Sequence, residues 1–361
     1  ELTSGLPPDQ QFPDMSVENE DFYFYRPTEQ ETKLSLYQPI FNPDIYYNYK
    51  ISKDYTTVGY LDVNIYKREL IAEIKTAYYN FLKTHYVLNL LNQTLNVVEE
   101  NVRVNQSLFK NDKVTFDVVD RSEAEYSKVE QQLAEAEKNN EIAAAYFNFL
   151  LNRPLYEEIL LWDDPAVKTK EINIDKALKS ALTNREEFKL IEAYTSASEN
   201  FLKMNKMNKA PTLIAAVDYG IQGENYKLDN KSDYLLGSVV LKWELFAGHS
   251  NNAKIQQAKL EKQILREKQN ELEKQINLEV IKAYYDILAA EKSIESARKQ
   301  QESAGSAFNL INKKYNQGQA NLIEFMDARN SMTNAKQNFI ITIADYLVKY
   351  AELERVTGIY D

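Results

Sequence analysis

The sequence predicts a mainly α-helical protein made of two tandem copies of one unit, each holding an extended segment followed by two very long helices. Three observations predict this class: a pattern that repeats along the chain, heptad spacing over long proline-free stretches, and segments of alternating polarity ahead of them. The 361 residues include only 9 Gly and 9 Pro, too few turn residues for an all-β protein of this size.

The chain repeats itself at an interval of about 206 residues. The segment AYYNFL at 77–82 returns as AYYDIL at 283–288, and LYQPIF at 36–41 returns as LKWELF at 241–246. A third match pairs Asn111, Asp117 and Asp120 with Gly318, Glu324 and Asp327. Three matches in one order at nearly one interval indicate a tandem duplication.

Heptad spacing predicts that the long helices pack along other helices. Apolar residues in the second copy recur at intervals of 3, 4 and 7, at Leu265, Leu272, Ile276, Val280, Ala283, Ile287, Ala290 and Ile294. No proline interrupts the first copy between Asp44 and Phe109. At about 1.5 Å per residue, such a helix is about 100 Å long and requires partners along its length.

Each pair of helices is expected to meet in a tight turn. In the second copy Gly318 suits the left-handed position after a helix, and Asn321 with Glu324 resembles a capping box. In the first copy we expect Asn111 to replace that glycine and Thr115 to cap the next helix, with Asp117 in its first turn. Both turns are therefore predicted at the same end of the molecule.

Alternation predicts strands before the long helices. Thr212 to Gln222 places mostly apolar residues on one face, and Val239, Leu241, Trp243 and Leu245 alternate with polar residues after a loop. Such a hairpin is typical of a transmembrane β-hairpin or of a soluble hairpin packed on helices. The first copy offers one clear strand, Thr32 to Phe41. We expect its other strand to lie near or before Glu1, and we expect the helix that would lead into that strand to be missing from this chain. Even four strands are too few to close a barrel, which predicts oligomerisation.

Composition excludes several other classes. The net charge of −11 argues against a nucleic-acid partner, and without cysteine there is neither a disulfide framework nor a thiolate metal site. The two histidines, His85 and His249, are far apart, and no phosphate-binding glycine motif occurs. We therefore expect no cofactor, no metal and no catalytic residue. The 25 tyrosines suit either a membrane–water boundary or aromatic packing.

The chain resembles the TolC-like outer-membrane efflux proteins from about Thr32 to Gly358. The resemblance depends on the order of four motifs: ALKSAL with NREE from Ala177 to Glu187, APTL at 210–213, WELFAG at 243–248 and YNQG at 315–318. It implies a bacterial outer-membrane homotrimer in which each chain gives up to four strands to a 12-stranded barrel embedded in lipid. It also implies a periplasmic helical tunnel that meets an adaptor protein bound to an inner-membrane transporter.

Carried over by position, the resemblance also implies roles for individual residues. The expected pore gate consists of Glu324, Asp327, Asp117, Asp120 and Tyr315. The expected adaptor-docking tips are Asn111, Asp112, Lys113, Val114, Thr115, Gly318, Gln319, Ala320 and Asn321. The expected membrane-boundary aromatics are Tyr219, Trp243, Phe246 and Phe41. Ala320 and Phe116 depart from the family pattern, which has an arginine and a small polar residue at these positions. The contacts that close the gate are therefore expected to differ in this chain.

The predicted domains follow from this reading. They are barrel strands and a loop at 1–41, a helical hairpin at 42–153, an equatorial linker with the start of the second repeat at 154–210, a barrel hairpin at 211–247, and a second helical hairpin with an equatorial part at 248–361. The alternative interpretation is a soluble coiled-coil scaffold, which explains the heptads but not the duplicated strand-plus-helix order. A glycan-processing enzyme is a more distant alternative.

Overall fold

A computed structural model describes residues 28–161, 172–224 and 232–359. The chain divides into two compact units, which we call the sheet unit (residues 1–48 and 203–255) and the helical unit (residues 49–202 and 256–361). The order of elements repeats, with a strand and two long helices in each copy. This order confirms the duplication and the mainly helical class.

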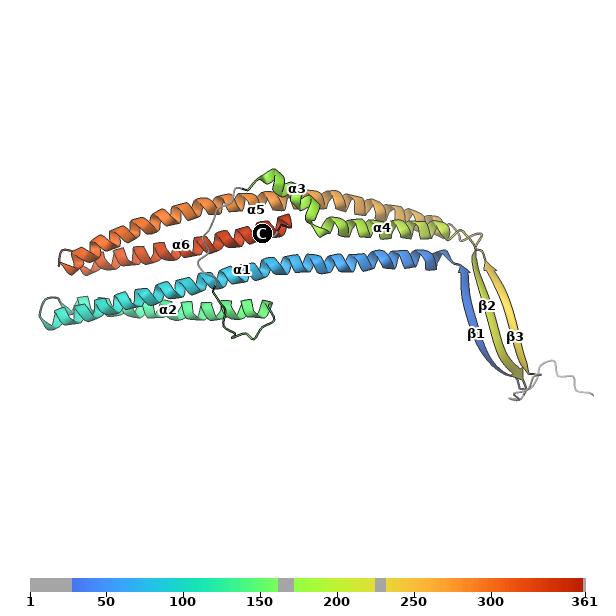
Figure 1. Cartoon of the computed structure of the whole chain (residues 1–361), viewed down its shortest axis with the longest axis horizontal. Coiled ribbons are helices and arrows are strands. Elements are labelled where there is room, and N and C mark those ends of the chain that lie inside the picture. Colours follow the sequence, from blue (N-terminus) through green and yellow to red (C-terminus); the bar gives the residue numbers. More distant parts are fainter. Residues whose placement is uncertain (1–27, 162–171, 225–231, 360–361) are drawn as a thin grey trace, which may run out of the picture. The chain divides into compact units, whose positions relative to one another are not determined.

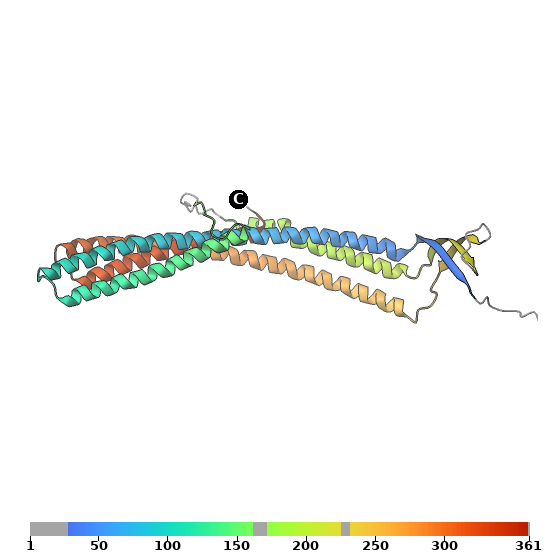
Figure 2. The same cartoon turned by 90° about the horizontal axis from the view of Figure 1, so that it is seen from below.

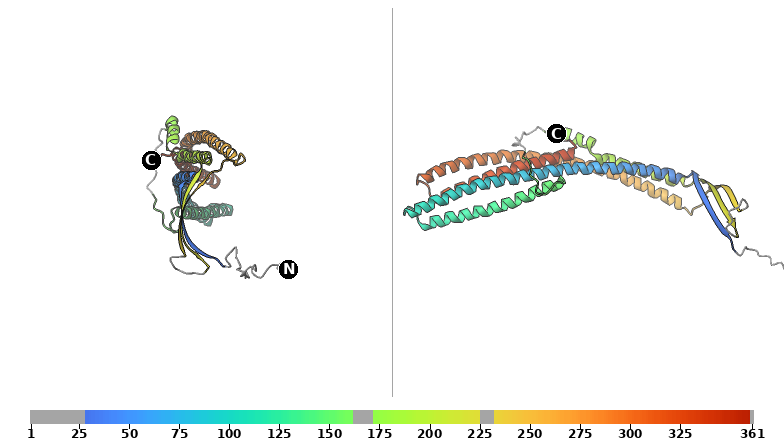
Figure 3. Two further views of the ribbon diagram at one scale, coloured as in Figure 1. Left: turned by 90° about the vertical axis from the view of Figure 1, so that its right-hand side faces the viewer. Right: turned by 60° about the horizontal axis from the view of Figure 1, so that its bottom comes forward.

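The sheet unit contains three antiparallel strands in the order β1, β2, β3, namely Gln30–Phe41, Thr212–Gly223 and Asp233–Lys242 (Figures 1 and 3). At Gly220 a β-carbon would come within 2.9 Å of the Lys33 side chain, so glycine permits β1 to approach β2. Trp243 and Leu245, expected in the last strand, lie beyond its end at Lys242. The expected fourth strand falls outside the described residues.

Two long helical hairpins form most of the helical unit. Helix α1 (Pro43–Lys110) has 68 residues and α5 (Ser250–Asn316) has 67. Their return helices, α2 (Phe116–Leu150) and α6 (Leu322–Thr357), have 35 and 36 residues, about half the length of α1 and α5. Figures 1 and 2 show α1 beside α2 and α5 beside α6, running towards the two turns.

Helix α1 begins where the sequence places a cap and a proline together. The Asn42 side chain accepts hydrogen bonds from the backbone N–H groups of Asp44 (3.0 Å) and Ile45 (3.4 Å). Pro43 occupies the first helical position, where its missing N–H costs nothing. Two shorter helices, α3 (Ile174–Asn184) and α4 (Glu186–Met207), precede β2.

The predicted heptad seam of α5 forms the core of the helical unit. Ile276, Val280 and Ile287 are fully buried, and Ala283 is nearly so. They pack against Tyr346, Leu353 and Val356 of α6 and Ala177 and Ala181 of α3. The seam prediction is confirmed.

Across the described ranges of the chain, no helix combines the length and the apolar character needed to cross a membrane.

Candidate functional site at the hairpin turns and the sheet face

The turn between α5 and α6 forms as the sequence predicts. Gly318 adopts a left-handed backbone (φ 71°), and the Gln319 N–H donates to the Lys314 carbonyl at 2.8 Å. The Asn321 side chain accepts from the Glu324 N–H, and the Glu324 carboxylate accepts from the Asn321 N–H, both at 2.9 Å. The capping box is therefore confirmed, and it fixes one Glu324 oxygen at the start of α6.

The turn between α1 and α2 differs from its prediction by one residue. Asp112, not Asn111, has the left-handed backbone (φ 55°), and the Lys113 N–H donates to the Leu108 carbonyl at 3.0 Å. The Asn111 side chain instead donates to the Ser107 carbonyl at 2.7 Å. Thr115 stands at the N-cap but makes no side-chain capping bond, because its hydroxyl donates to the Asp117 carboxylate.

These turns correct the register between the two copies. Asp112 matches Gly318, and the two N-caps, Thr115 and Asn321, have nearly the same backbone angles. The interval at the turns is therefore about 206 residues, as it is at the AYYNFL match. At this interval Glu324 corresponds to Val118 and not to Asp117, so the third sequence match was one residue out of register. The first hairpin consequently has no acidic residue at the capping-box position.

Tyr315 is bound inside the helical unit by α1. Its hydroxyl donates to Asn105 at 2.8 Å and accepts from Asn101 at 3.3 Å, while its ring stacks on Phe325 with centroids 4.7 Å apart. Asn105 is fully buried. The hydrogen bonds described for Tyr315 thus join the second hairpin to α1, whereas Asp117 accepts its bond from Thr115 within the first turn.

The other expected gate and docking residues lie close to the two turns. Glu324 and Asp327 are exposed on α6, and Asp120 is exposed on α2. Asn111, Asp112, Lys113, Thr115, Gly318, Gln319 and Asn321 are exposed at the tips, and Val114 and Ala320 are half-buried. Phe116 is 63% exposed and lies edge-to-face against Phe109, with ring centroids 5.7 Å apart.

One buried ion pair was not predicted from the sequence. Arg329 of α6 is 2% exposed and donates to Glu125 of α2, whose outer side also meets Lys128 at 3.8 Å. The pair joins the two hairpins. One turn further along α6, the hydroxyl of Thr333 lies 3.5 Å from the hydroxyl of Thr94 on α1, which is a second polar contact between the hairpins. An arginine within the apolar pattern of α6 was the available signal, although its partner lies 204 residues away.

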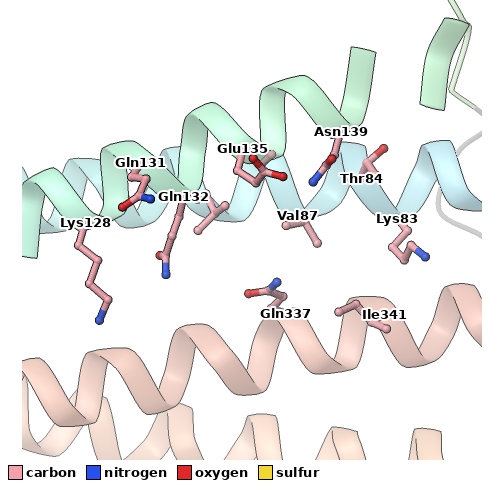
Figure 4. A pocket seen from close by; sticks show the side chains of 12 residues that line it. Lys83, Thr84, Val87, Lys128, Gln131, Gln132, Glu135, Asn139, Gln337 and Ile341 are labelled. Atoms are coloured by element: carbon pink, nitrogen blue, oxygen red, sulfur yellow. The ribbon is translucent and has the colours of Figure 1, made fainter. Parts of the chain in front are cut away.

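A groove of about 670 Å³ separates the hairpins beyond this pair. In Figure 4, Lys128 and Gln132 of α2 extend towards Gln337 and Ile341 of α6 across the gap. The groove has a mixed polar and apolar lining and contains no cluster of charged groups that would bind a metal. Among the described residues, no group of three or more His, Asp or Glu side chains has that arrangement.

The sheet carries one apolar face. The register places Leu34 beside Tyr219 and Tyr219 beside Leu235, and it places Leu36 beside Val217 on the same face. Leu34, Leu36, Leu235, Val239 and Leu241 are between 61% and 76% exposed. The opposite face is mixed: Glu31, Lys33, Ser35, Asp218 and Tyr234 lie on it together with Tyr37, Leu236 and Val240, which are between 52% and 64% exposed. A wide exposed apolar face opposite a more polar one is suited to contact with lipid.

The expected boundary aromatics occupy two levels of the sheet unit. Phe41 ends β1, and Trp243 and Phe246 follow β3 at the same end, where the Trp243 indole donates to the Lys209 carbonyl at 3.0 Å. Tyr219 lies six residues along β2 from Leu213, the partner of Phe41. At about 3.4 Å per residue this is about 20 Å away.

Comparison with known proteins finds a matching family and several solved structures of similar fold. The model of the outer membrane efflux protein family matches residues 177–359. The fold is similar to that of the CmeC outer membrane channel of Campylobacter jejuni, with TM-score 0.77 and 13% identity over 91% of this chain and 77% of that one. It is also similar to the open-state MtrE outer membrane channel of Neisseria gonorrhoeae, with TM-score 0.73 and 15% identity over 92% and 80%.

A third similar structure is the outer membrane protein VceC of Vibrio cholerae, with TM-score 0.71 and 12% identity over 92% of this chain and 87% of that one. No curated protein sequence matches the chain. The family match spans half of the chain, including the second repeat with its capping box. The chain therefore belongs to the outer membrane efflux protein family, a family of export channels and not of enzymes or coiled-coil scaffolds.

Proposed function

We propose that three copies of this chain form the exit duct of a tripartite export system. In this arrangement the strands of three chains close one barrel in the outer membrane, and the helical hairpins form a tunnel on its periplasmic side. The observation that carries the proposal is the highly exposed, mainly apolar face of the three-stranded sheet. Three strands leave open edges, which neighbouring copies would pair.

The partners follow from the two ends of the duct. The similar structures CmeC and MtrE are outer membrane channels, and the family is one of efflux proteins. We assign the exposed tips around Asp112 and Gly318 to docking of a periplasmic adaptor, which would link the duct to an inner-membrane transporter. Both tips are closed by backbone hydrogen bonds, so each presents a fixed surface to a partner.

The gate belongs to the same tips. Glu324 is held by the capping box, and Asp327 stands one turn further along α6, so threefold symmetry would place six carboxylates around one axis. Such a ring attracts cations and permits block by divalent ions. Tyr315, bonded to Asn105 and Asn101, would hold the second hairpin against the first in the closed state. Since Ala320 cannot form an ion pair, packing and these hydrogen bonds would replace a salt bridge.

Substitution of the acidic pair tests the gate. Glu324→Ala with Asp327→Ala should abolish block by divalent cations, because the ring would lose its charge. The measurement is single-channel current with and without added Mg²⁺. Glu302→Ala, which removes an exposed carboxylate from α5, is the control and should leave the block intact. Undiminished block in the double variant would remove these residues from the gate.

The experiment that tests the function is single-channel recording of the protein in a planar lipid bilayer. Small, cation-selective currents from a particle of three chains are expected. A folded protein that stays out of lipid and conducts no current would overturn the proposal and restore the coiled-coil scaffold.

A further inference from the structure

Three helices of the helical unit enclose a mainly apolar pocket, which is separate from the hairpin turns. Its volume is about 430 Å³, within the range of small-molecule sites. Its lining includes Ile51 and Tyr55 of α1, Tyr194 and Phe201 of α4, and Glu261 and Ile264 of α5. Tyr55 and Ile264 are each 55% exposed, so a molecule in solvent can reach the pocket.

Polar contacts outside the pocket hold its walls together. On one side, Asp54 of α1 accepts hydrogen bonds from two α4 side chains, Ser196 at 3.2 Å and Asn200 at 2.9 Å. On the other side, Lys262 of α5 pairs with Glu199 of α4. Helix α4 is therefore bound to both long helices, and the pocket between them is preformed.

Aromatic rings line the pocket on its α1 and α4 sides. Tyr55 and Tyr194 meet edge-to-face, with ring centroids 6.1 Å apart. Phe201 follows Tyr194 by about two turns and so lies on the same face of α4. The face of an aromatic ring carries partial negative charge and attracts a cation. The rings therefore offer both an apolar surface and a preference for positive charge.

Glu261 supplies the one full charge among the residues that line the pocket. Its carboxylate accepts a hydrogen bond from the Gln257 side chain at 3.0 Å, and it forms no ion pair with any residue that the structure describes. The neighbouring Lys262 is already paired with Glu199. A half-buried carboxylate beside apolar groups interacts more strongly with a cation than one in bulk water does.

This lining distinguishes between classes of ligand. Divalent metal ions need several oxygen ligands, which one carboxylate among mainly apolar groups does not supply. An anion would be repelled by Glu261, and a neutral molecule would gain nothing from its charge. An organic cation with an apolar body matches both the rings and the carboxylate.

We propose that this pocket binds an organic cation with apolar substituents, of the quaternary ammonium or phosphonium class. Glu261 faces the positive charge, and Tyr55, Tyr194 and Phe201 pack around the apolar body. The site is a property of the helical unit and does not depend on the proposed duct.

Calorimetric titration of the full chain in an uncharged detergent tests the site, with the detergent solution alone as the blank. The probes are tetraphenylphosphonium and tetraphenylborate, which have nearly the same shape and opposite charges. The cation should bind, and the anion should bind much more weakly. Glu261→Gln and Tyr55→Leu should each weaken binding of the cation about fivefold, because the first removes the charge and the second removes a ring.

Two matched variants control for effects outside the pocket. Glu267→Gln removes an exposed carboxylate from α5, and Tyr60→Leu removes a ring from α1 that is 72% exposed. Neither residue lines the pocket, so both variants should bind the cation as the native protein does.

The outcomes separate the site from the proposed function. Binding of the cation that is weakened only in the two pocket variants supports the site. Heats no larger than the detergent blank, equal binding of the two ions, or the same affinity in pocket and control variants would overturn it. Because the titration needs no bilayer, binding by a protein that conducts no current would keep the site and reject the duct.

Discussion

Arg329 and Glu125 are the most deeply buried charged partners between the two hairpins. Arg329 is 2% exposed and Glu125 is 9% exposed. Removing two charges from water costs several kcal/mol, which their attraction and hydrogen bond offset when both are present. The pair therefore specifies how the hairpins align more than it stabilises them, and a missing partner leaves a buried charge.

Arg329→Met should destabilise the protein by about 3 kcal/mol, because Glu125 would remain buried with only the exposed and more distant Lys128 as a partner. Adding Glu125→Leu should recover most of the loss, since the double variant leaves neither charge. The measurement is denaturant unfolding followed by helical circular dichroism. Arg103→Met is the control, because Arg103 is paired with Glu100 on the surface, where water screens the pair, and its loss should leave the stability almost unchanged. A double variant as unstable as the single one would contradict this account.

Glu187 is a half-buried charge, held between two buried arginines. It accepts from Arg185 at 2.6 Å and from Arg68 at 2.5 Å. Burial raises the pKa of the Glu187 carboxyl, but the hydrogen bonds from Arg185 and Arg68 lower it by more, so that the pKa falls to about 2. Because the folded pKa lies below the usual 4.5, the stabilisation is present above pH 4.5 and disappears as pH falls towards 2.

Glu187→Gln should therefore flatten the dependence of stability on pH between about 4.5 and 2. Thermal unfolding of the native and variant proteins across this range is the measurement. Glu100→Gln serves as the control, since its partner Arg103 is fully exposed and solvent screens the pair. A native protein whose unfolding temperature is constant between these pH values would contradict the role of Glu187.

Local residue patterns predicted one turn better than the other. Gly318, Asn321 and Glu324 form a motif within seven residues, so their roles follow from sequence alone. The first turn has Asn111 and Asp112 side by side, and both residue types tolerate a left-handed backbone, so the pattern did not decide between them. The bond from Tyr315 to Asn105 joins residues 210 apart and leaves no local signature.

At the scale of helices, the two hairpins start their return helices differently. Helix α6 begins with a complete capping box, whereas α2 begins at Thr115 without a side-chain capping bond. A lost N-cap costs about 1 kcal/mol and frays the first turn. The return helix of the second hairpin therefore starts more firmly than that of the first.

Asn321→Ala should destabilise the start of α6 by about 1 kcal/mol, while Thr115→Ala should change α2 by only a few tenths. Amide exchange of the residues following each cap measures the two effects. Equal acceleration in both variants would show that Thr115 caps α2 in solution.

The sequence predicted which segments are helices and strands but not all of their lengths or partners. Heptads and the absence of proline were sufficient for α1 and α5, because nothing else accommodates such long regular patterns. The return helices end at Leu150 and Thr357, close to the ends of the predicted hairpins, whereas β3 ends at Lys242, before Trp243 and Leu245. The pairing of β1 with β2 was not predictable, since alternation fixes faces and not neighbours.

At the scale of the whole molecule, the apolar sheet face is the feature that fits a membrane. Leu34→Lys should reduce insertion into lipid by about 2–4 kcal/mol, because it places a charge on that face. Ser35→Lys, one residue along on the polar face, should insert normally. The measurement is the fraction of protein recovered in liposomes after refolding. Equal recovery of the two variants in liposomes would contradict the inference that the apolar face of the sheet contacts lipid.

The pairing of β1 with β2 also dictates the order in which the chain folds. Gln30 lies opposite Gly223, so about 190 residues separate the two partners. During synthesis and translocation, β1 must wait until both strands and the whole first hairpin have emerged. Until then its edge remains open to any other strand, and the apolar residues beside it favour aggregation.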